Sequence, residues 1–260
     1  MLPDVKVVSL VSIGQHPKSG RARRAEQDAR AVELGLKLCA DSLELLHAGD
    51  AGEESLRAYL GMGLNAMTVL EQPPEADAVA ALSDYLDSQR PDIVLTGVRA
   101  ESGEASGMTP YLLAEKLGWP VVSRVADITR IENGEAEILQ ALPRGQRRAL
   151  TVSLPFVASV DMAAAAPRQS AYGPARRAAI DGVPVTLVLD DERNDWTEAP
   201  ARKRPKRLKV VKAKTAADRF KAATAKSQGD GGKVIKDKPA REQAQAILDL
   251  LIEEGVFRQS

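Results

Sequence analysis

Two stretches of the sequence combine small residues with hydrogen-bonding groups. Residues 47–70 open with His-Ala-Gly-Asp-Ala-Gly-Glu-Glu-Ser, a pattern that predicts a strand end, a turn and a helix with two acids in its first turn. Backbone N–H groups at such a helix start suit the sugar or phosphate of a nucleotide, although an ordinary helix start has the same pattern. Residues 97–109 form a loop rich in Gly, Ser and Glu. This loop is long for a connection, and its small residues let a ligand approach the backbone closely.

Residue types suited to catalysis or metal binding are scarce. The sequence contains two histidines and one cysteine, and it lacks a GxxxxGKS phosphate loop, a GxGxxG fingerprint after the first strand and a GxSxG elbow. We expect His16 to be an exposed loop residue, His47 to be partly buried at a strand end, and Cys39 to be an inert packed thiol. The sequence therefore predicts neither a catalytic constellation nor a metal site.

Alternating strand and helix patterns would position both stretches. Short apolar runs predict buried strands, and apolar residues at helical spacing predict helices between them. The predicted strands are 5–11, 43–48, 66–70 and 92–96, and the predicted helices are 25–38, 53–62, 76–89 and 109–117. Short connections favour βαβ units around a parallel sheet. Such sheets bind ligands at the carboxyl ends of their strands, so loops 12–28, 48–52 and 98–109 should surround one crevice.

The pattern changes after residue 117. Residues 121–131 alternate between apolar and polar, and Asn133-Gly134 is a strong hairpin signal. Residues 137–142 and 148–154 continue as strands, so we expect an antiparallel hairpin excursion before a last core strand at 156–160.

The C-terminal part differs in charge from the rest of the chain. Residues 202–238 contain fourteen Lys or Arg and three Asp, whereas the 36 basic and 36 acidic residues of the whole chain balance. We expect a nucleotide-binding α/β domain at 1–190, an extended basic arm at 191–240 and a C-terminal helix at 241–260. The apolar face of that helix requires a surface to pack on, which suggests docking to another chain.

Composition excludes several classes of protein. With 260 residues and 44% hydrophobic residues, the chain can bury a substantial core. No apolar run approaches the ~20 residues of a membrane span, and no secretory signal is recognisable, so we expect a cytoplasmic protein without membrane insertion. The basic arm holds one aromatic residue, Phe220, which offers little surface for stacking bases. A solvated arm over an acidic partner is therefore favoured over nucleic-acid binding.

The order of several motifs is similar to that of the β subunit of electron transfer flavoprotein, across roughly residues 4–190. The similarity is carried by Ala48-Gly-Asp, by Glu-Ser-Leu-Arg-Ala-Tyr-Leu-Gly-Met-Gly-Leu-Asn-Ala from Glu54, by Asp28-Ala-Arg-Ala-Val-Glu, by Leu113-Ala-Glu-Lys-Leu-Gly-Trp-Pro and by Pro167-Arg168. The resemblance implies an open parallel sheet of the Rossmann-like, adenine nucleotide α-hydrolase-like type.

The resemblance also implies a function. It predicts an electron carrier rather than an enzyme, in a heterodimer whose α subunit holds FAD, with a flavin dehydrogenase as electron donor and a quinone oxidoreductase as acceptor. Family β subunits also hold a structural AMP. Carried over to this chain, the AMP-binding positions are Leu10, Ala25, Asp28, Ala48, Gly49, Glu101, Gly103, Ser106, Gly107 and Thr109.

Further positions follow from the same resemblance. Alignment on Pro167-Arg168 places Tyr172 where the family anchors its partner dehydrogenases, and Arg176 and Arg177 flank that position. His16 and Gln27 are expected near the flavin.

The chain departs from the family in three places. The family motif before the first helix is replaced by Ala25-Glu-Gln-Asp28, the first turn is shortened to residues 15–20, and the acidic loop that ends in Gln-Thr-Gly is replaced at 101–109. AMP, another nucleotide or no ligand therefore remain open for the crevice. The alternative function is a stand-alone adenine-nucleotide-binding α/β protein without a redox role.

Overall fold

The computed structural model describes residues 5–103, 105–190, 195–197, 199, 215–217, 220, 236 and 238–253. The chain divides into two compact units, residues 1–197 and 198–260. The central sheet and the pockets described below belong to the first unit.

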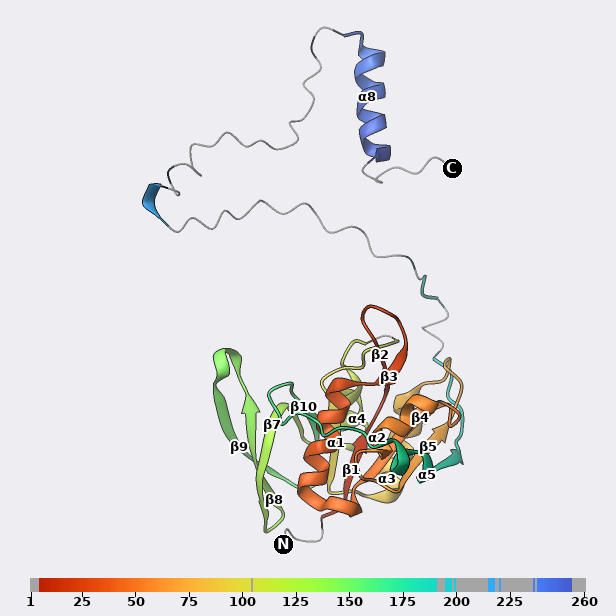
Figure 1. The fold of residues 1–260 in the computed structure, drawn as a ribbon, viewed down its shortest axis with the longest axis vertical. Coiled ribbons are helices and arrows are strands. Elements are labelled where there is room, and N and C mark those ends of the chain that lie inside the picture. The colour runs from red at the N-terminus through yellow and green to blue at the C-terminus, as the bar shows by residue number, and fades with distance from the viewer. Residues whose placement is uncertain are drawn as a thin grey trace. The chain divides into compact units, whose positions relative to one another are not determined.

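The described residues form a nine-stranded sheet in the order β11-β5-β4-β1-β6-β10-β7-β8-β9 (Figure 1). Its parallel strands are β1 (Val7–Leu10), β4 (Glu44–Gly49), β5 (Ala66–Glu71), β6 (Ile93–Gly97), β10 (Phe156–Val160) and β11 (Ala179–Pro184), and β7 (Val121–Glu132) runs parallel to β10. The excursion adds the antiparallel strands β8 (Glu135–Ala141) and β9 (Arg147–Ser153). The α/β, Rossmann-like fold with an antiparallel hairpin excursion is confirmed.

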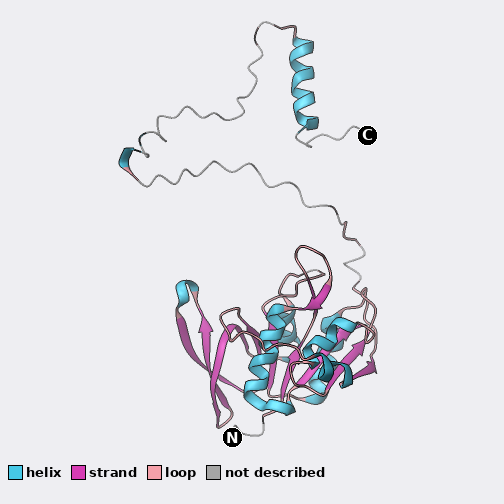
Figure 2. Cartoon of the chain, in the orientation of Figure 1, coloured by secondary structure: helices cyan, strands magenta, loops and turns pink. Residues whose placement is uncertain are grey.

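Helices cover both faces of the parallel part of the sheet (Figure 2). Strand residues that alternate along β1 divide between two apolar clusters, because successive side chains point to opposite faces. Val7 packs with α1 (Glu26–Cys39) on one face, and Val8 packs with α3 (Ala78–Gln89) and α4 (Thr109–Leu117) on the other. The inner strands β1, β6 and β10 are buried on both faces, which explains their uninterrupted apolar runs.

The turn after β7 follows the sequence prediction closely. Asn133 and Gly134 adopt φ values of 53° and 78°. A two-residue hairpin turn of this type needs positive φ at both positions, which Asn and Gly tolerate best.

Three local predictions differ from the structure. The predicted loop 12–28 contains a small antiparallel hairpin, β2 (Ile13–Gln15) with β3 (Ala22–Arg24). The predicted helix 53–62 is a short 3-10 helix (Glu54–Leu56) followed by α2 (Arg57–Leu60). Two elements follow β10 that the sequence prediction missed, α5 (Tyr172–Arg177) and the edge strand β11. The residues of β11 are exposed or partly exposed and do not give the apolar run expected of a buried strand.

The C-terminal unit is described mainly by α8 (Ala240–Glu253), which lies within the predicted helix 241–260 except for its first residue. Ile247, Leu250 and Leu251 of α8 are exposed apolar residues. Most of the predicted arm at 191–240 and residues 254–260 lie outside the described residues. None of the described helices is long and apolar enough to cross a membrane.

Candidate functional site

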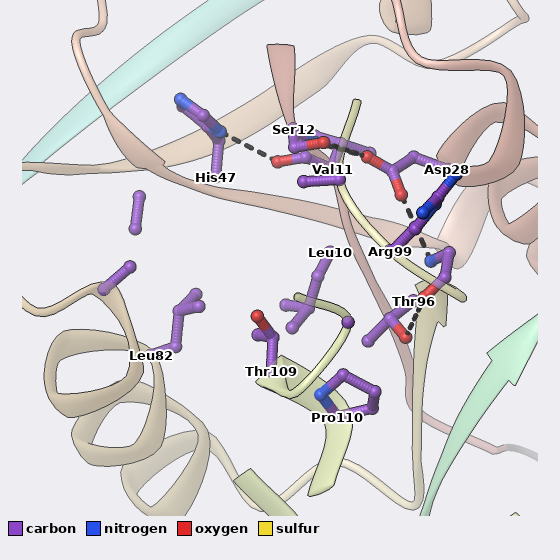
Figure 3. A pocket seen from close by; sticks show the side chains of 15 residues that line it. Leu10, Val11, Ser12, Asp28, His47, Leu82, Thr96, Arg99, Thr109 and Pro110 are labelled. Atoms are coloured by element: carbon purple, nitrogen blue, oxygen red, sulfur yellow. Dashed lines mark hydrogen bonds between the residues drawn. The ribbon is translucent and has the colours of Figure 1, made fainter. Parts of the chain in front are cut away.

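A pocket lies at the carboxyl ends of β1, β4 and β6. From β1 the chain adds β4 and β5 on one side of the sheet, and from β6 it adds β10 on the other, so the strand order reverses between β1 and β6. Ligands of open α/β sheets bind at such a switch point. The pocket has a volume of about 210 Å³ and is lined by Leu10, Val11, Ser12, Asp28, His47, Ala48, Ala78, Leu82, Thr96, Gly97, Arg99, Ala100, Gly107, Thr109 and Pro110 (Figure 3).

One side of this pocket is polar because of Asp28, near the start of α1. The Asp28 carboxylate accepts hydrogen bonds from the Ser12 N–H (2.8 Å), the Ser12 hydroxyl and the Gly97 N–H (3.1 Å). Burial raises the pKa of Asp28 from 3.8 to about 6, although these hydrogen bonds oppose the shift. Gly97 is required at the end of β6, since a Cβ atom there would lie 2.3 Å from the Asp28 Oδ1 atom.

The opposite side of the pocket is apolar. Leu82 of α3 lies across the pocket from Asp28 and Arg99 (Figure 3), and Ala78 lies one turn earlier on the same helix. Ala48 at the end of β4 contributes a small side chain. A pocket with one apolar side and a few convergent polar groups on the other suits a ligand that joins a flat apolar ring to a polar group.

His47 is buried in the pocket wall, where the sequence prediction expected only a partly buried edge residue. The Nδ1 atom of His47 lies 2.8 Å from the Val11 carbonyl oxygen, which ties the end of β4 to the end of β1. Burial lowers the pKa of this imidazole, so the neutral form is favoured, with Nδ1–H donating to the carbonyl. The contact needs Gly49 beside it, because a Cβ atom at position 49 would lie 2.6 Å from the His47 Nε2 atom.

A second, more open pocket of about 530 Å³ shares Arg99 and Ala100 with the first. Its other lining residues are Gln15, Pro17, Arg23, Glu26, Gln27, Glu101, Ala105 and Met162.

Glu101 forms the wall of the second pocket. Its carboxylate accepts hydrogen bonds from the Gln15 N–H (3.1 Å), the Glu26 N–H (2.9 Å) and the Arg23 guanidinium group (2.9 Å). One side chain therefore joins the 98–108 loop to the β2–β3 hairpin and to the first turn of α1. The helix dipole adds to this stabilisation, since a carboxylate is favoured at a helix N-terminus.

The structure brings together some of the predicted site residues. Leu10, Asp28, Ala48, Gly107 and Thr109 line the first pocket, and Gln27 and Glu101 line the second. Ala25, Gly49, Gly103, Ser106 and His16 line neither.

The side chains or backbone groups of three of these residues make local contacts outside the two pockets. Ala25 is buried beneath the site, where its N–H donates to the Tyr59 hydroxyl. The Ser106 hydroxyl accepts from the Met108 N–H, and His16 Nδ1 accepts from the Ser19 N–H.

Sequence reasoning missed several lining residues, among them Ser12, Thr96, Gly97 and Arg99. They lie at the ends of β1 and β6, which are neighbours in the sheet although about 85 residues separate them in the chain. The signal that could have found them was the expected loop position after each strand. It indicated the region but could not indicate which side chains point inward.

Two of the quoted sequence motifs meet at a different place, the segment 168–178. Glu33 of α1 accepts from the Arg168 backbone N–H, Nε and Nη2 at 2.9–3.0 Å, and this ion pair lowers the pKa of Glu33. The Arg57 guanidinium group donates to the Ala178 carbonyl oxygen (3.0 Å). Gly61 allows close contact, since a Cβ atom there would lie 2.1 Å from the Ser170 Oγ atom. The motif from Glu54 therefore supports this segment rather than a nucleotide.

The supported segment presents Tyr172 at the start of α5. The Tyr172 side chain is 78% exposed. Arg176 lies 3.9 Å from Glu54, and Arg177 is exposed. A large aromatic side chain held outward on a braced segment has the properties of an interface anchor.

Comparison with known proteins identifies the family. Residues 19–188 match the electron transfer flavoprotein domain. The chain is also 54% identical, over 99% of its length and 98% of the relative's, to a protein named electron transfer flavoprotein subunit beta from Chromohalobacter salexigens. The chain belongs to the electron transfer flavoprotein family. The resemblance found in the sequence motifs is therefore confirmed.

Membership in this family fixes the general role of the chain. It is an electron carrier subunit rather than an enzyme, the family implies that a flavin is involved, and a β subunit implies an α subunit as partner. Among the described residues, no cluster of three or more His, Cys, Asp or Glu side chains is arranged to hold a metal ion.

Proposed function

We propose that this chain is the β subunit of an electron transfer flavoprotein heterodimer. In this proposal FAD is held mainly by the α subunit, accepts electrons from a flavin dehydrogenase and passes them to a quinone oxidoreductase. The observation that carries the proposal is the 54% identity to a protein named as a β subunit over nearly the whole of both chains. The proposal includes a cytoplasmic location, no nucleic-acid partner and no membrane insertion.

We propose AMP as the ligand of the pocket between β1 and β6. The residues present fit such a group: the apolar side near Leu82 would take the adenine ring, and the polar side near Ser12 and Asp28 would take the ribose hydroxyls. In this proposal AMP stabilises the fold of the β subunit and takes no part in electron transfer. The five predicted residues that line the pocket are its proposed contacts.

A volume change at Ala48 tests the nucleotide proposal. Ala48→Trp places an indole ring where the pocket is lined by a methyl group, so AMP should no longer bind. With the wild type, AMP at ~1,000-fold above its dissociation constant should stabilise the folded state by about 4 kcal/mol, and this stabilisation should disappear in the variant. Thermal unfolding of nucleotide-free protein with and without AMP measures both. Ala149→Trp, at an exposed position of β9, should retain the AMP effect. No AMP effect on the wild type would contradict the nucleotide proposal.

The second pocket is the proposed place where this chain approaches the flavin of the α subunit. Gln27 lines it, and His16 lies in the adjoining turn between β2 and β3. Bound FAD would supply the redox chemistry. The Arg23, Gln15 and Gln27 side chains offer hydrogen-bond donors toward its polar edge.

Two surfaces are proposed to bind partners. The exposed apolar residues of α8 suit a groove on the α subunit, since an amphipathic helix needs a surface to cover its apolar face. Tyr172 is proposed to anchor the donor dehydrogenase, with Arg176 and Arg177 steering an acidic partner toward it.

Co-expression with the α subunit tests the proposed heterodimer. The purified complex should be yellow, its flavin absorbance should bleach when a donor dehydrogenase and its substrate are added, and the absorbance should return when a quinone oxidoreductase and quinone follow. A colourless, stable homodimer of this chain would contradict the proposal and favour the stand-alone adenine-nucleotide-binding protein.

A further inference from the structure

Arg99 carries a guanidinium group that has no described partner within the chain. It follows β6 and lines both pockets at the point where they adjoin. Its backbone N–H donates to the Gln27 Oε1 atom (3.1 Å), which fixes the main chain. The guanidinium group itself makes no hydrogen bond or ion pair with any residue that the structure describes.

The other charged groups around Arg99 are already paired. Arg23 binds Glu101 at 2.9 Å, and Arg30 binds Glu26 at 3.1 Å. The Asp28 carboxyl group already accepts three hydrogen bonds, two from Ser12 and one from the Gly97 N–H. The Arg99 guanidinium group therefore forms no ion pair with a described neighbour, and Arg99 lines both pockets.

An unpaired guanidinium group at the junction of two pockets is suited to bind an anion. Its planar array of N–H donors matches the oxygen atoms of a phosphate, and charge-assisted hydrogen bonds of this kind are stronger than neutral ones. Among the residues that the structure describes, the neighbouring carboxylates of Glu26 and Glu101 are already paired with other arginines.

We infer that Arg99 binds the phosphate of the nucleotide in the pocket between β1 and β6, and so makes the site select a nucleotide over the uncharged nucleoside. This inference rests on the proposed nucleotide binding. In this arrangement the ring lies toward Leu82, and the phosphate lies across the pocket toward Arg99 and the second pocket (Figure 3).

Isothermal titration of AMP and adenosine tests this assignment, with the full chain purified as the complex with its α subunit and freed of nucleotide. Arg99→Gln removes the charge and keeps a hydrogen-bonding side chain of similar shape. It should weaken AMP binding by about 10- to 100-fold, because a hydrogen bond to a charged group contributes about 1.5–3 kcal/mol. Adenosine should bind the variant and the wild type within about twofold, because it lacks the phosphate. The control Arg148→Gln removes an exposed arginine of β9, which lines neither pocket, and should leave both affinities unchanged.

The outcomes separate this inference from the proposal on which it rests. If wild-type protein binds AMP and Arg99→Gln binds it equally well, Arg99 is not the phosphate ligand and nucleotide binding stands. Equal affinities of the wild type for AMP and adenosine would likewise overturn the inference alone. If the wild type binds neither compound, the nucleotide proposal fails and the role of Arg99 fails with it.

Discussion

The Asp28 carboxyl group couples protonation to folding stability. Burial raises its pKa from 3.8 to about 6 in the folded protein, whereas the unfolded chain exposes it to water. The folded state therefore binds this proton more tightly than the unfolded state. The resulting stabilisation is fully present below about pH 4 and is lost as the pH rises through about 6. The shift corresponds to about 3 kcal/mol.

We predict that wild-type protein loses about 2–3 kcal/mol of unfolding free energy relative to Asp28→Asn between about pH 4 and about pH 7. The asparagine cannot ionise, while His47 and Glu33, whose pKa values are also shifted, act equally in both proteins. Urea denaturation followed by circular dichroism at several pH values measures the difference. A difference that does not vary with pH would show that Asp28 is not protonated in the folded state.

The Glu101 side chain holds the β2–β3 hairpin and the start of α1 against its own loop. We predict that Glu101→Gln destabilises the fold by about 1–3 kcal/mol, because an amide cannot replace a carboxylate that accepts from two backbone N–H groups and one guanidinium group. The control is Glu115→Gln, at an exposed position of α4, which should change stability by less than about 0.5 kcal/mol. Equal denaturation midpoints for both variants would remove the bracing role.

Some of these residues were within reach of sequence reasoning and others were not. Asp28 and Glu101 were named because the resemblance to the family carries its AMP-binding positions over to them. The interactions that define their roles were not predictable, since the partners Ser12, Gly97 and Gln15 are far from Asp28 or Glu101 in the sequence and come close only in the folded chain.

At the scale of elements, the inner strands and long helices were predictable because burial on both faces gives uninterrupted apolar runs. The hairpin β2–β3 and the strand β11 were not, because most of their residues are exposed or partly exposed and neither sequence gives an uninterrupted apolar run. The predicted helix 53–62 is shorter mainly because residues 54–56 form a 3-10 helix, so that α2 covers only Arg57–Leu60. Gly61, directly after α2, packs against the segment 168–178.

The ion pair between Glu33 and Arg168 is predicted to hold the segment 168–178 in place. Glu33→Gln should increase the rate of backbone hydrogen exchange in this segment by about tenfold or more, since a partly buried bidentate pair that loses its charge loses of the order of 1–3 kcal/mol. Exchange in α3 and β6 should not change. The matched control Glu135→Gln, at the exposed hairpin turn, should leave the segment protected. Unchanged exchange in the Glu33 variant would assign the bracing to Arg57 and Gly61 alone.

At the scale of the whole molecule, Tyr172 links the braced segment to electron delivery. We predict that Tyr172→Ala slows reduction of the flavin by the donor dehydrogenase by about tenfold or more, the loss expected for an interface anchor. Flavin content and unfolding temperature should stay the same, because the Tyr172 side chain is 78% exposed. Stopped-flow absorbance at several dehydrogenase concentrations measures the rate.

The control for this prediction is Tyr111→Ala, which removes another exposed tyrosine, on α4. It should leave the rate of flavin reduction unchanged. If Tyr172→Ala lowers the unfolding temperature without changing the rate of flavin reduction, Tyr172 stabilises its own domain and does not bind the dehydrogenase.

The central claim is that this chain works as one half of a flavin-containing heterodimer with a nucleotide in its own pocket. Native mass spectrometry of the purified complex tests all of its parts at once. The account predicts a single species that contains one 27.9 kDa chain, one α subunit, one FAD and one AMP, and gentle activation should release AMP from the β subunit. A species made of copies of this chain alone, without flavin, would contradict the account.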